Sequence, residues 1–285
     1  QQFFLNGSPH YFIGTNYWYG GLLPLEKNKE KGIDRLKSEL DFLKAHGVVN
    51  LRVLAGSEGK GLINGVERVV PPLQTAAGMF DPEFLKGMDV LLAELGKRKM
   101  TAVLYLSNNW NWSGGFLQYL KWHGQIPDSI FSKDIPWSML GEYTSKFYDC
   151  DQCISDYRKQ IKYVVGRTNS ITHKKYSEEP ALMAWEIANE PRPMRPSAVG
   201  SYKKFIRSSA AYIKELDPNH LVTTGTEGYM STDNMDLYTQ IHDDKNIDYL
   251  TIHIWPKNWS WFKGKDVAGG IGAVLNKTEV YLNAH

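Results

Sequence analysis

The sequence predicts an α/β protein with the architecture of a (β/α)8 TIM barrel. Strand-like and helix-like segments alternate from one end of the chain to the other, as a parallel sheet with helical connections requires. The length of 285 residues is close to the roughly 250 residues of such a barrel. One buried strand ends in Asn and Glu, and barrel enzymes carry their chemistry at the carboxyl ends of their strands. We therefore expect residues 1–285 to form a single catalytic barrel domain.

Hydrophobic spacing and helix-end signals define the elements of the first half. Apolar residues recur at helical spacing over 34–45, and Gly47 stops that helix. Asp81 is expected to cap the next helix, with Pro82 at its first position. The insertion at about 108–148 is long enough to carry function or cover a site. The predicted strands and helices are 12–17, 34–45, 48–54, 82–97 and 100–106.

The second half continues the alternation, with helices at 154–168, 199–216, 234–242 and 271–282 and strands at 181–187, 221–224 and 247–253. Six strand–helix units are present by this count, which is two fewer than a closed barrel needs. A barrel without two strands would expose unpaired sheet edges and an open core. We therefore expect the chain to be part of a longer protein, interrupted before strand seven.

Composition excludes some classes of protein and favours others. The formal net charge of +2 gives no footprint for nucleic acid, and no apolar run approaches the ~18 residues of a membrane span. The chain starts at Gln1 without an initiator Met or signal peptide, so any targeting segment would already have been removed. Aromatic residues are abundant (9 Trp, 16 Tyr, 11 Phe), and Trp in predicted loops suggests platforms for sugar rings, although such residues could equally anchor an interface.

Cys150 and Cys153 form a Cys-x-x-Cys pair. A zinc site would need a second ligand pair, and a redox motif would need a thioredoxin-like context. The spacing favours a short disulfide at the start of a helix, which is consistent with a secreted or otherwise extracytoplasmic protein. Two free thiols remain an alternative.

The most informative stretch runs from the apolar segment 181–187 into Asn189 and Glu190, where Pro191 prevents a regular continuation. A Glu at this position suits cleavage of a glycosidic bond, because it can protonate the leaving oxygen while the Asn binds a sugar hydroxyl. The alternative is a strand end with ordinary polar residues. Arg192, two residues further on, favours catalysis.

The motif AWEIANEPR at 184–192 closely resembles the fourth-strand signature of glycoside hydrolase family 5, and within it the endo-β-1,4-mannanases. Three more segments match in order: GTNYW at 14–18, NLRVL at 50–54 and HIW at 253–255. The resemblance extends over nearly all of the chain. It implies a retaining endo-β-1,4-mannanase that hydrolyses internal links of mannan or glucomannan with two Glu residues and with no metal or cofactor.

The resemblance also assigns roles within the site. Glu190 is the expected general acid/base, with Asn189 beside it and His253 shaping the subsite at the scissile bond. Arg52 lies inside a strand and needs a carboxylate partner, which a buried salt bridge would provide. The resemblance favours Arg52 as the group that positions the nucleophile and keeps it ionised, and the two roles are compatible. Glu186 would lie about 13 Å from Glu190 along the strand, too far for a pair separated by ~5–10 Å, so a barrel-interior role is expected. Expected substrate contacts are Trp18, Asn109, Trp110, Arg192, Glu227 and Trp255.

The second catalytic carboxylate is expected after His285, because the family carries its nucleophile at the end of strand seven. Glu279 lies in a predicted helix and does not match. Three alternatives stay open: a β-1,4-glucanase or an exo-β-mannosidase of the same family, or a non-catalytic carbohydrate-binding barrel. A metal-dependent hydrolase is disfavoured because no His, Asp and Glu set has ligand-like spacing. The sequence does not indicate the oligomeric state.

Overall fold

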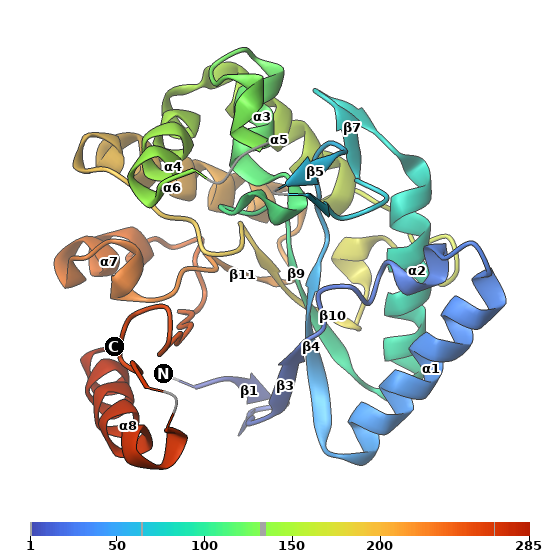
Figure 1. Ribbon diagram of the computed structural model, residues 1–285. Helices are drawn as coiled ribbons and strands as arrows, with labels where there is room; N and C mark the ends of the chain where they lie inside the picture. Colours follow the sequence, from blue (N-terminus) through green and yellow to red (C-terminus); the bar gives the residue numbers. More distant parts are fainter. Residues whose placement is uncertain (1, 64, 132–134, 265) are drawn as a thin grey trace.

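The computed structural model describes residues 2–63, 65–131, 135–264 and 266–285. Its centre is a parallel five-stranded sheet whose strands follow one another in space as they do in the sequence (Figure 1). The strands are β3 (Ile13–Asn16), β4 (Val48–Leu54), β9 (Thr101–Tyr105), β10 (Leu182–Glu186) and β11 (Leu221–Thr223). Helices connect consecutive strands and cover the outer face, so the sheet forms a curved part of a barrel wall, as the sequence predicts.

The helices are α1 (Lys29–Ala45), α2 (Pro82–Arg98), α3 (Gly115–Trp122), α4 (Trp137–Ser145), α5 (Asp151–Val165), α6 (Val199–Leu216), α7 (Met235–His242) and α8 (Val267–Ala284). Among the described residues, short antiparallel pairs are formed by β1 (Phe4–Leu5) with β2 (Ser8–Pro9), β5 (Leu62–Ile63) with β6 (Val66–Glu67), and β7 (Gln74–Ala76) with β8 (Met79–Phe80). Within the described ranges, no helix combines the length and apolar character that crossing a bilayer requires.

The helix-end signals act as the sequence predicts. The Asp81 side chain accepts a hydrogen bond from the Glu83 amide at the start of α2. Gly47 follows α1 with a φ of 81°, which a glycine adopts without steric cost. The start of α1 was predicted too late, because the Asn28 side chain caps the helix by accepting from the Lys31 amide.

The predicted strand at 247–253 is not formed. The segment runs beside β11, where the Asp248 amide donates to the Val222 carbonyl at 2.8 Å. The Val222 amide, however, donates to the Asp248 carboxylate (2.7 Å), and the Thr223 hydroxyl donates to the Tyr249 carbonyl (2.8 Å). Because side chains occupy these positions, the regular backbone ladder is interrupted, although the segment keeps its predicted place next to β11.

The described parts of the insertion, 108–131 and 135–148, contain α3 and α4 and pack against the rest of the fold. Phe116 of α3 stacks on Phe147 with ring centroids 4.1 Å apart, and both rings contact Phe205 of α6. Phe116 is fully buried, and replacing such a residue by Ala costs about 3–5 kcal/mol. This aromatic cluster fixes the insertion against α6.

Cys150 and Cys153 form a disulfide with Cα atoms 5.2 Å apart, as predicted. Cys150 is also the N-cap of α5, since its sulfur accepts from the Cys153 amide. The bond therefore closes the first turn of α5, immediately after the insertion.

Candidate active site

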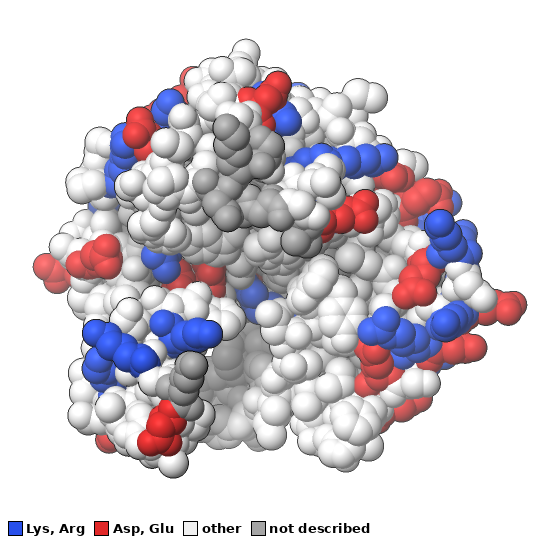
Figure 2. Space-filling model, viewed as in Figure 1, with Lys and Arg blue, Asp and Glu red and all other residues white. Residues whose placement is uncertain are grey.

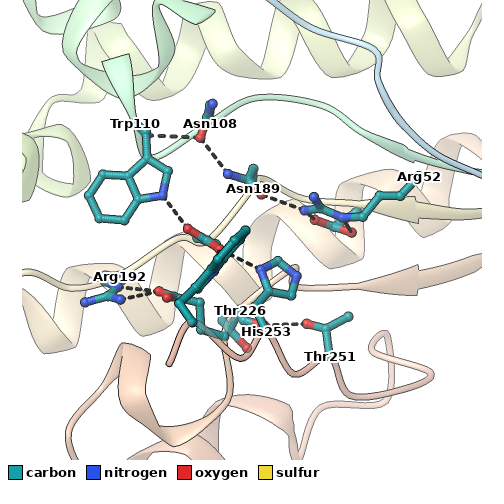
Figure 3. Close-up of polar contacts among 12 residues, drawn as sticks. Arg52, Asn108, Trp110, Asn189, Arg192, Thr226, Thr251 and His253 are labelled. Atoms are coloured by element: carbon teal, nitrogen blue, oxygen red, sulfur yellow. Dashed lines mark hydrogen bonds and ion pairs between the residues drawn. The ribbon is translucent and has the colours of Figure 1, made fainter. Parts of the chain in front are cut away.

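Polar side chains converge at the carboxyl ends of β4, β9 and β10 (Figure 3). Glu190 follows β10 with a φ of 53°, a left-handed conformation that costs a non-glycine residue about 1–3 kcal/mol. Neighbouring strand ends hold this turn: the Asn189 amide donates to the Ser107 carbonyl and the Glu190 amide to the Gly225 carbonyl, both at 2.9 Å. The backbone is thus fixed in a conformation that presents the Glu190 side chain at the sheet edge.

Three ring N–H groups surround the Glu190 carboxylate. Trp110 Nε1 donates to one oxygen at 2.5 Å, while Trp255 Nε1 and His253 Nδ1 lie 2.8 Å from the other. Glu190 is buried, with the residue as a whole 6% exposed. Burial raises the pKa of Glu190, but the hydrogen bond and charge of His253 and the two indole donors outweigh it, so the pKa lies below its ordinary value. The site can therefore stabilise Glu190 as a carboxylate.

His253 reaches Glu190 because the segment before it is tied to the residues after β11. The Thr251 hydroxyl donates to the Thr226 carbonyl at 2.8 Å, as Figure 3 shows. The predicted strand six is irregular, yet this contact brings His253 to the position that the sequence predicts.

Arg52 forms a salt bridge, one of its two expected roles, and the partner is Glu186. Its Nε donates to Glu186 at 3.0 Å, and its terminal nitrogen contacts both Glu186 and the Asn189 side-chain oxygen, the latter at 2.8 Å. The Asn189 amide nitrogen then donates to the Asn108 side chain at 3.0 Å. These contacts on both sides fix the orientation of the Asn189 amide beside Glu190. The proposed contact of Arg52 with a nucleophile stays a prediction.

Arg192 and Glu227 form a second ion pair, in which Glu227 is buried and Arg192 is partly buried. Arg192 Nε donates to Glu227 at 2.6 Å, and Glu227 is 1% exposed. The guanidinium also lies 5.5 Å from the ring centre of Trp110 and 5.7 Å from that of Trp137. Burial and the nearby Glu190 charge raise the pKa of Glu227 despite this pairing. Arg192 thereby links the end of β10 to the segment after β11.

Two cavities meet at Glu190. One, of about 330 Å³, lies over the sheet and is lined by Trp18, Arg52, Tyr105 and Trp112 among others. The other, of about 740 Å³, is lined by Trp137, Arg192, Glu227, Asn258 and Trp259. Both share Trp110, Glu190 and Trp255 as walls. Figure 2 shows the hollow on this face, with charged side chains of both signs lying mainly towards the edge of the molecule.

Most of the predicted site residues come together around these cavities: Trp18, Arg52, Trp110, Asn189, Glu190, Arg192, Glu227, His253 and Trp255. Asn109 is placed differently. It is fully buried, its amide nitrogen points to the Met194 sulfur at 3.7 Å, and it lines neither cavity. The structure therefore does not place Asn109 where a sugar would contact it.

Tyr105 and Trp137 line the site but were not among the residues predicted for it. Tyr105 ends β9 and has Arg52 over its ring at 4.5 Å, so its position at a strand end was an available signal. Trp137 starts α4 in the insertion, and its ring centroid lies 5.5 Å from that of Trp110. Only the packing of the insertion reveals this contact. Among the described residues, no group of three or more His, Cys, Asp and Glu could hold a metal ion.

A buried Glu at the carboxyl edge of a barrel sheet, between two cavities walled by Trp, is the arrangement of a barrel glycoside hydrolase. The model of the GH family 5 beta-mannosidase-like group matches residues 1–285, and the chain belongs to this family. The family predicted from the AWEIANEPR motif is therefore confirmed.

Individual relatives agree with this assignment. Mannan endo-1,4-beta-mannosidase 7 of Arabidopsis thaliana is 30% identical over 275 residues, covering 90% of this chain and 57% of its own. Mannan endo-1,4-beta-mannosidase 4 of Oryza sativa subsp. japonica is 28% identical over 235 residues, or 78% of this chain and 47% of its own. The chain thus spans about half the length of the curated relatives that it matches.

Solved structures support the barrel fold. The glycoside hydrolase family 5 mannosidase from Rhizomucor miehei superposes with a TM-score of 0.87 at 29% identity, covering 99% of this chain and 66% of that one. The endo-1,4-beta-mannanase from the same organism, at 24% identity and a TM-score of 0.70, covers 99% of this chain and 77% of that one and shows the shared fold. The predicted fold class is confirmed.

Proposed function

We propose that the protein is a retaining endo-β-1,4-mannanase that cleaves internal links of mannan or glucomannan, with Glu190 as general acid/base. The observation that carries the proposal is the position of Glu190 on the wall between two aromatic cavities. A glycosidic bond placed beside this carboxyl would have its two sugars in different cavities. The family membership and the names of the curated relatives support mannan as the substrate.

The proposed chemistry has two steps. Protonated Glu190 gives its proton to the departing glycosidic oxygen while a second carboxylate attacks the anomeric carbon. The Glu190 carboxylate then takes a proton from water while the water oxygen attacks the anomeric carbon and displaces the second carboxylate, which releases the sugar with retained configuration. His253, Trp110 and Trp255 favour the ionised form that the second step needs. A nearby charged nucleophile would raise the pKa of Glu190 for the first step.

We assign no nucleophile among the described residues. Glu186 and Glu227 are the carboxylates nearest in the chain to Glu190 at the strand ends, and each is paired with an Arg. By the family resemblance, we propose that the nucleophile follows His285.

By the family resemblance, Arg192 contacts the sugar on the leaving-group side of the cleaved bond, and the shape of the cleft on that side supports endo action. A further cavity of about 710 Å³ shares Trp137 and Arg192 with the cavity beside Glu190. A cleft that continues past the leaving-group sugar has room for more of a polymer. The exo-β-mannosidase alternative also has one observation in its favour, since the solved mannosidase is more similar than the solved endo-mannanase.

Digestion of β-1,4-mannohexaose by the intact protein separates these proposals. Endo action predicts early release of mannobiose and mannotriose, whereas exo action predicts mannose from the first time point. Faster digestion of cellohexaose would indicate a glucanase. Binding of mannohexaose without cleavage would overturn the enzymatic proposal and support a carbohydrate-binding barrel.

We also propose an extracytoplasmic location, supported by the Cys150–Cys153 disulfide. Fractionation of the source cells tests it, and recovery of the protein in the cytoplasm with both thiols free would contradict it.

A further inference from the structure

The segment 107–115 connects β9 to α3 and carries Asn108 and Trp110, which both contact residues of the site. The side-chain oxygen of Asn108 accepts from the Asn189 amide nitrogen and from the Trp110 backbone amide, both at 3.0 Å. Trp110 in turn donates to Glu190. The position of this segment therefore determines where the Trp110 indole meets the Glu190 carboxylate.

Both ends of the segment bond to one carboxylate, that of Glu58. The Ser107 hydroxyl donates to one Glu58 oxygen at 2.9 Å, and the Gly115 amide donates to the other at 2.8 Å. Glu58 lies in the loop after β4 and is fully buried. Its carboxylate thus joins the start and the end of the segment from behind the site.

Further contacts hold Glu58 itself in place. Gln160 of α5 donates to the Glu58 carboxylate at 2.8 Å and to the Leu106 carbonyl at 2.7 Å, and the Tyr119 hydroxyl donates to the same carboxylate at 3.3 Å. The Glu58 backbone also packs directly against Gly114, because a Cβ on Gly114 would lie 1.9 Å from the Glu58 carbonyl oxygen. Glu58 and the segment 107–115 therefore form one tightly packed unit.

We propose that Glu58 is a positioning residue that fixes the segment 107–115 and thereby sets the Trp110 indole against Glu190, without touching substrate. Its catalytic consequence rests on the proposed function. Burial raises the pKa of the Glu58 carboxyl to about 7 even though four donors favour its ionised form. Burial makes the ionised carboxyl unfavourable at this position, yet the carboxylate supplies two acceptor oxygens, whereas a Gln would supply only one.

The test is Glu58→Gln in the intact protein, with β-1,4-mannohexaose as substrate. We expect kcat to fall roughly tenfold to a hundredfold, with KM little changed, because a displaced Trp110 misplaces the acid/base group. The basic limb of the pH profile should move to higher pH, since the Glu190 carboxylate loses a donor. Trp110→Phe should give the same shift, and the double variant should add nothing further.

A second buried carboxylate provides the matched control. Asp89 in α2 is also fully buried and accepts hydrogen bonds from Arg167, Ser170 and Tyr176, near the opposite end of the sheet. Asp89→Asn should lower the melting temperature without moving the pH limb. If Asp89→Asn moves the basic limb of the pH profile as Glu58→Gln does, the shift results from general destabilisation. The positioning role of Glu58 would then be wrong. Should Glu58→Gln fail to fold, Ser107→Ala removes one of the four contacts and should give a smaller shift in the same direction.

Hydrogen–deuterium exchange gives a readout that does not need activity. The amides of Asn109, Gly115 and Phe116 are bonded to Asn189, Glu58 and Asn108. We expect them to exchange at least tenfold faster in Glu58→Gln, but not in Asp89→Asn. Unchanged exchange together with an unchanged pH limb would overturn the inference. A wild-type protein that cleaves no mannoside would overturn the proposed function, while the exchange rates would still decide whether Glu58 positions the segment.

Discussion

The indole of Trp110, after β9, donates a 2.5 Å hydrogen bond to the carboxylate of Glu190, after β10. This contact joins two neighbouring strand ends and lies where the two aromatic cavities meet. Trp110 and Glu190, the candidate acid/base, both line the two cavities, so a sugar ring in either cavity would lie beside this contact. The ionisation of Glu190 and the placement of substrate are therefore coupled through one residue.

Removing the charge of His253 should raise the pKa of Glu190. After burial, which raises this pKa, the hydrogen bond and charge of His253 are the largest influences, and they lower it. The general acid must be protonated, so a higher pKa extends activity to higher pH. His253→Gln should accordingly move the basic limb of the kcat/KM profile upward.

His220→Gln is a suitable control for this experiment, because His220 pairs with Asp217 near the start of β11, away from Glu190. It should leave the profile in place. A basic limb in His253→Gln that stays fixed or moves downward would contradict the assigned contact.

Loss of Arg192 should affect long substrates more than short activated ones. Arg192 lines one of the two cavities beside Glu190. We propose that this cavity holds the leaving-group sugars, so Arg192→Ala should weaken kcat/KM for mannohexaose much more than for an aryl β-mannoside. Steady-state kinetics on the two substrates checks this. Equal losses on both would remove Arg192 from the leaving-group side.

The same substitution should destabilise the protein, for a separate reason. Glu227 is buried, and removing its partner leaves an uncompensated charge, which typically costs about 3–5 kcal/mol. Arg192→Ala with Glu227→Gln should recover much of the free energy of unfolding without recovering long-substrate activity. Urea denaturation of the single and double variants measures this recovery, and no recovery would show that the pair does not act as a unit.

Asp89 should make stability depend on pH in acid. Burial raises its pKa, but the hydrogen bonds from Arg167, Ser170 and Tyr176 outweigh this effect and hold the pKa below its ordinary value. A depressed pKa in the folded state stabilises the protein above the unfolded pKa of about 3.9, and this stabilisation is lost as pH falls. The melting temperature of Asp89→Asn should therefore vary less than that of the wild type below about pH 5. An unchanged slope in that range would contradict the prediction.

Local signals in the sequence predicted much of the fold. The cap at Asp81 and the stop at Gly47 lie where expected, because they depend on only a few neighbouring residues. The segment 247–253 was predicted as a strand from its apolar pattern, but the Asp248 side chain displaces a ladder bond. The Val222 amide donates to the Asp248 carboxylate in place of a backbone carbonyl. This contact depends on the position of the segment beside β11, so the sequence alone does not predict it.

The position of a site residue was predictable where a motif marked it, as for Glu190, Asn189 and His253, which lie together as expected. Arg52 was expected to have a carboxylate partner, but its identity as Glu186 depends on the pairing of strands. Asn109 belongs to a matching motif, yet its side chain turns into the core. Glu58 gave no sequence signal, because its role arises from contacts with residues 49, 57 and 102 positions away in the chain.

Azide rescue of Glu190→Ala tests the central claim most directly. With 2,4-dinitrophenyl β-mannoside, whose leaving group needs no acid, the variant should form the glycosyl-enzyme and then turn over slowly. Added azide should accelerate turnover and yield β-mannosyl azide, because azide attacks the intermediate without a general base. The account is contradicted if the product is α-mannosyl azide, which would make Glu190 the nucleophile, or if the variant cleaves mannan at near wild-type rates.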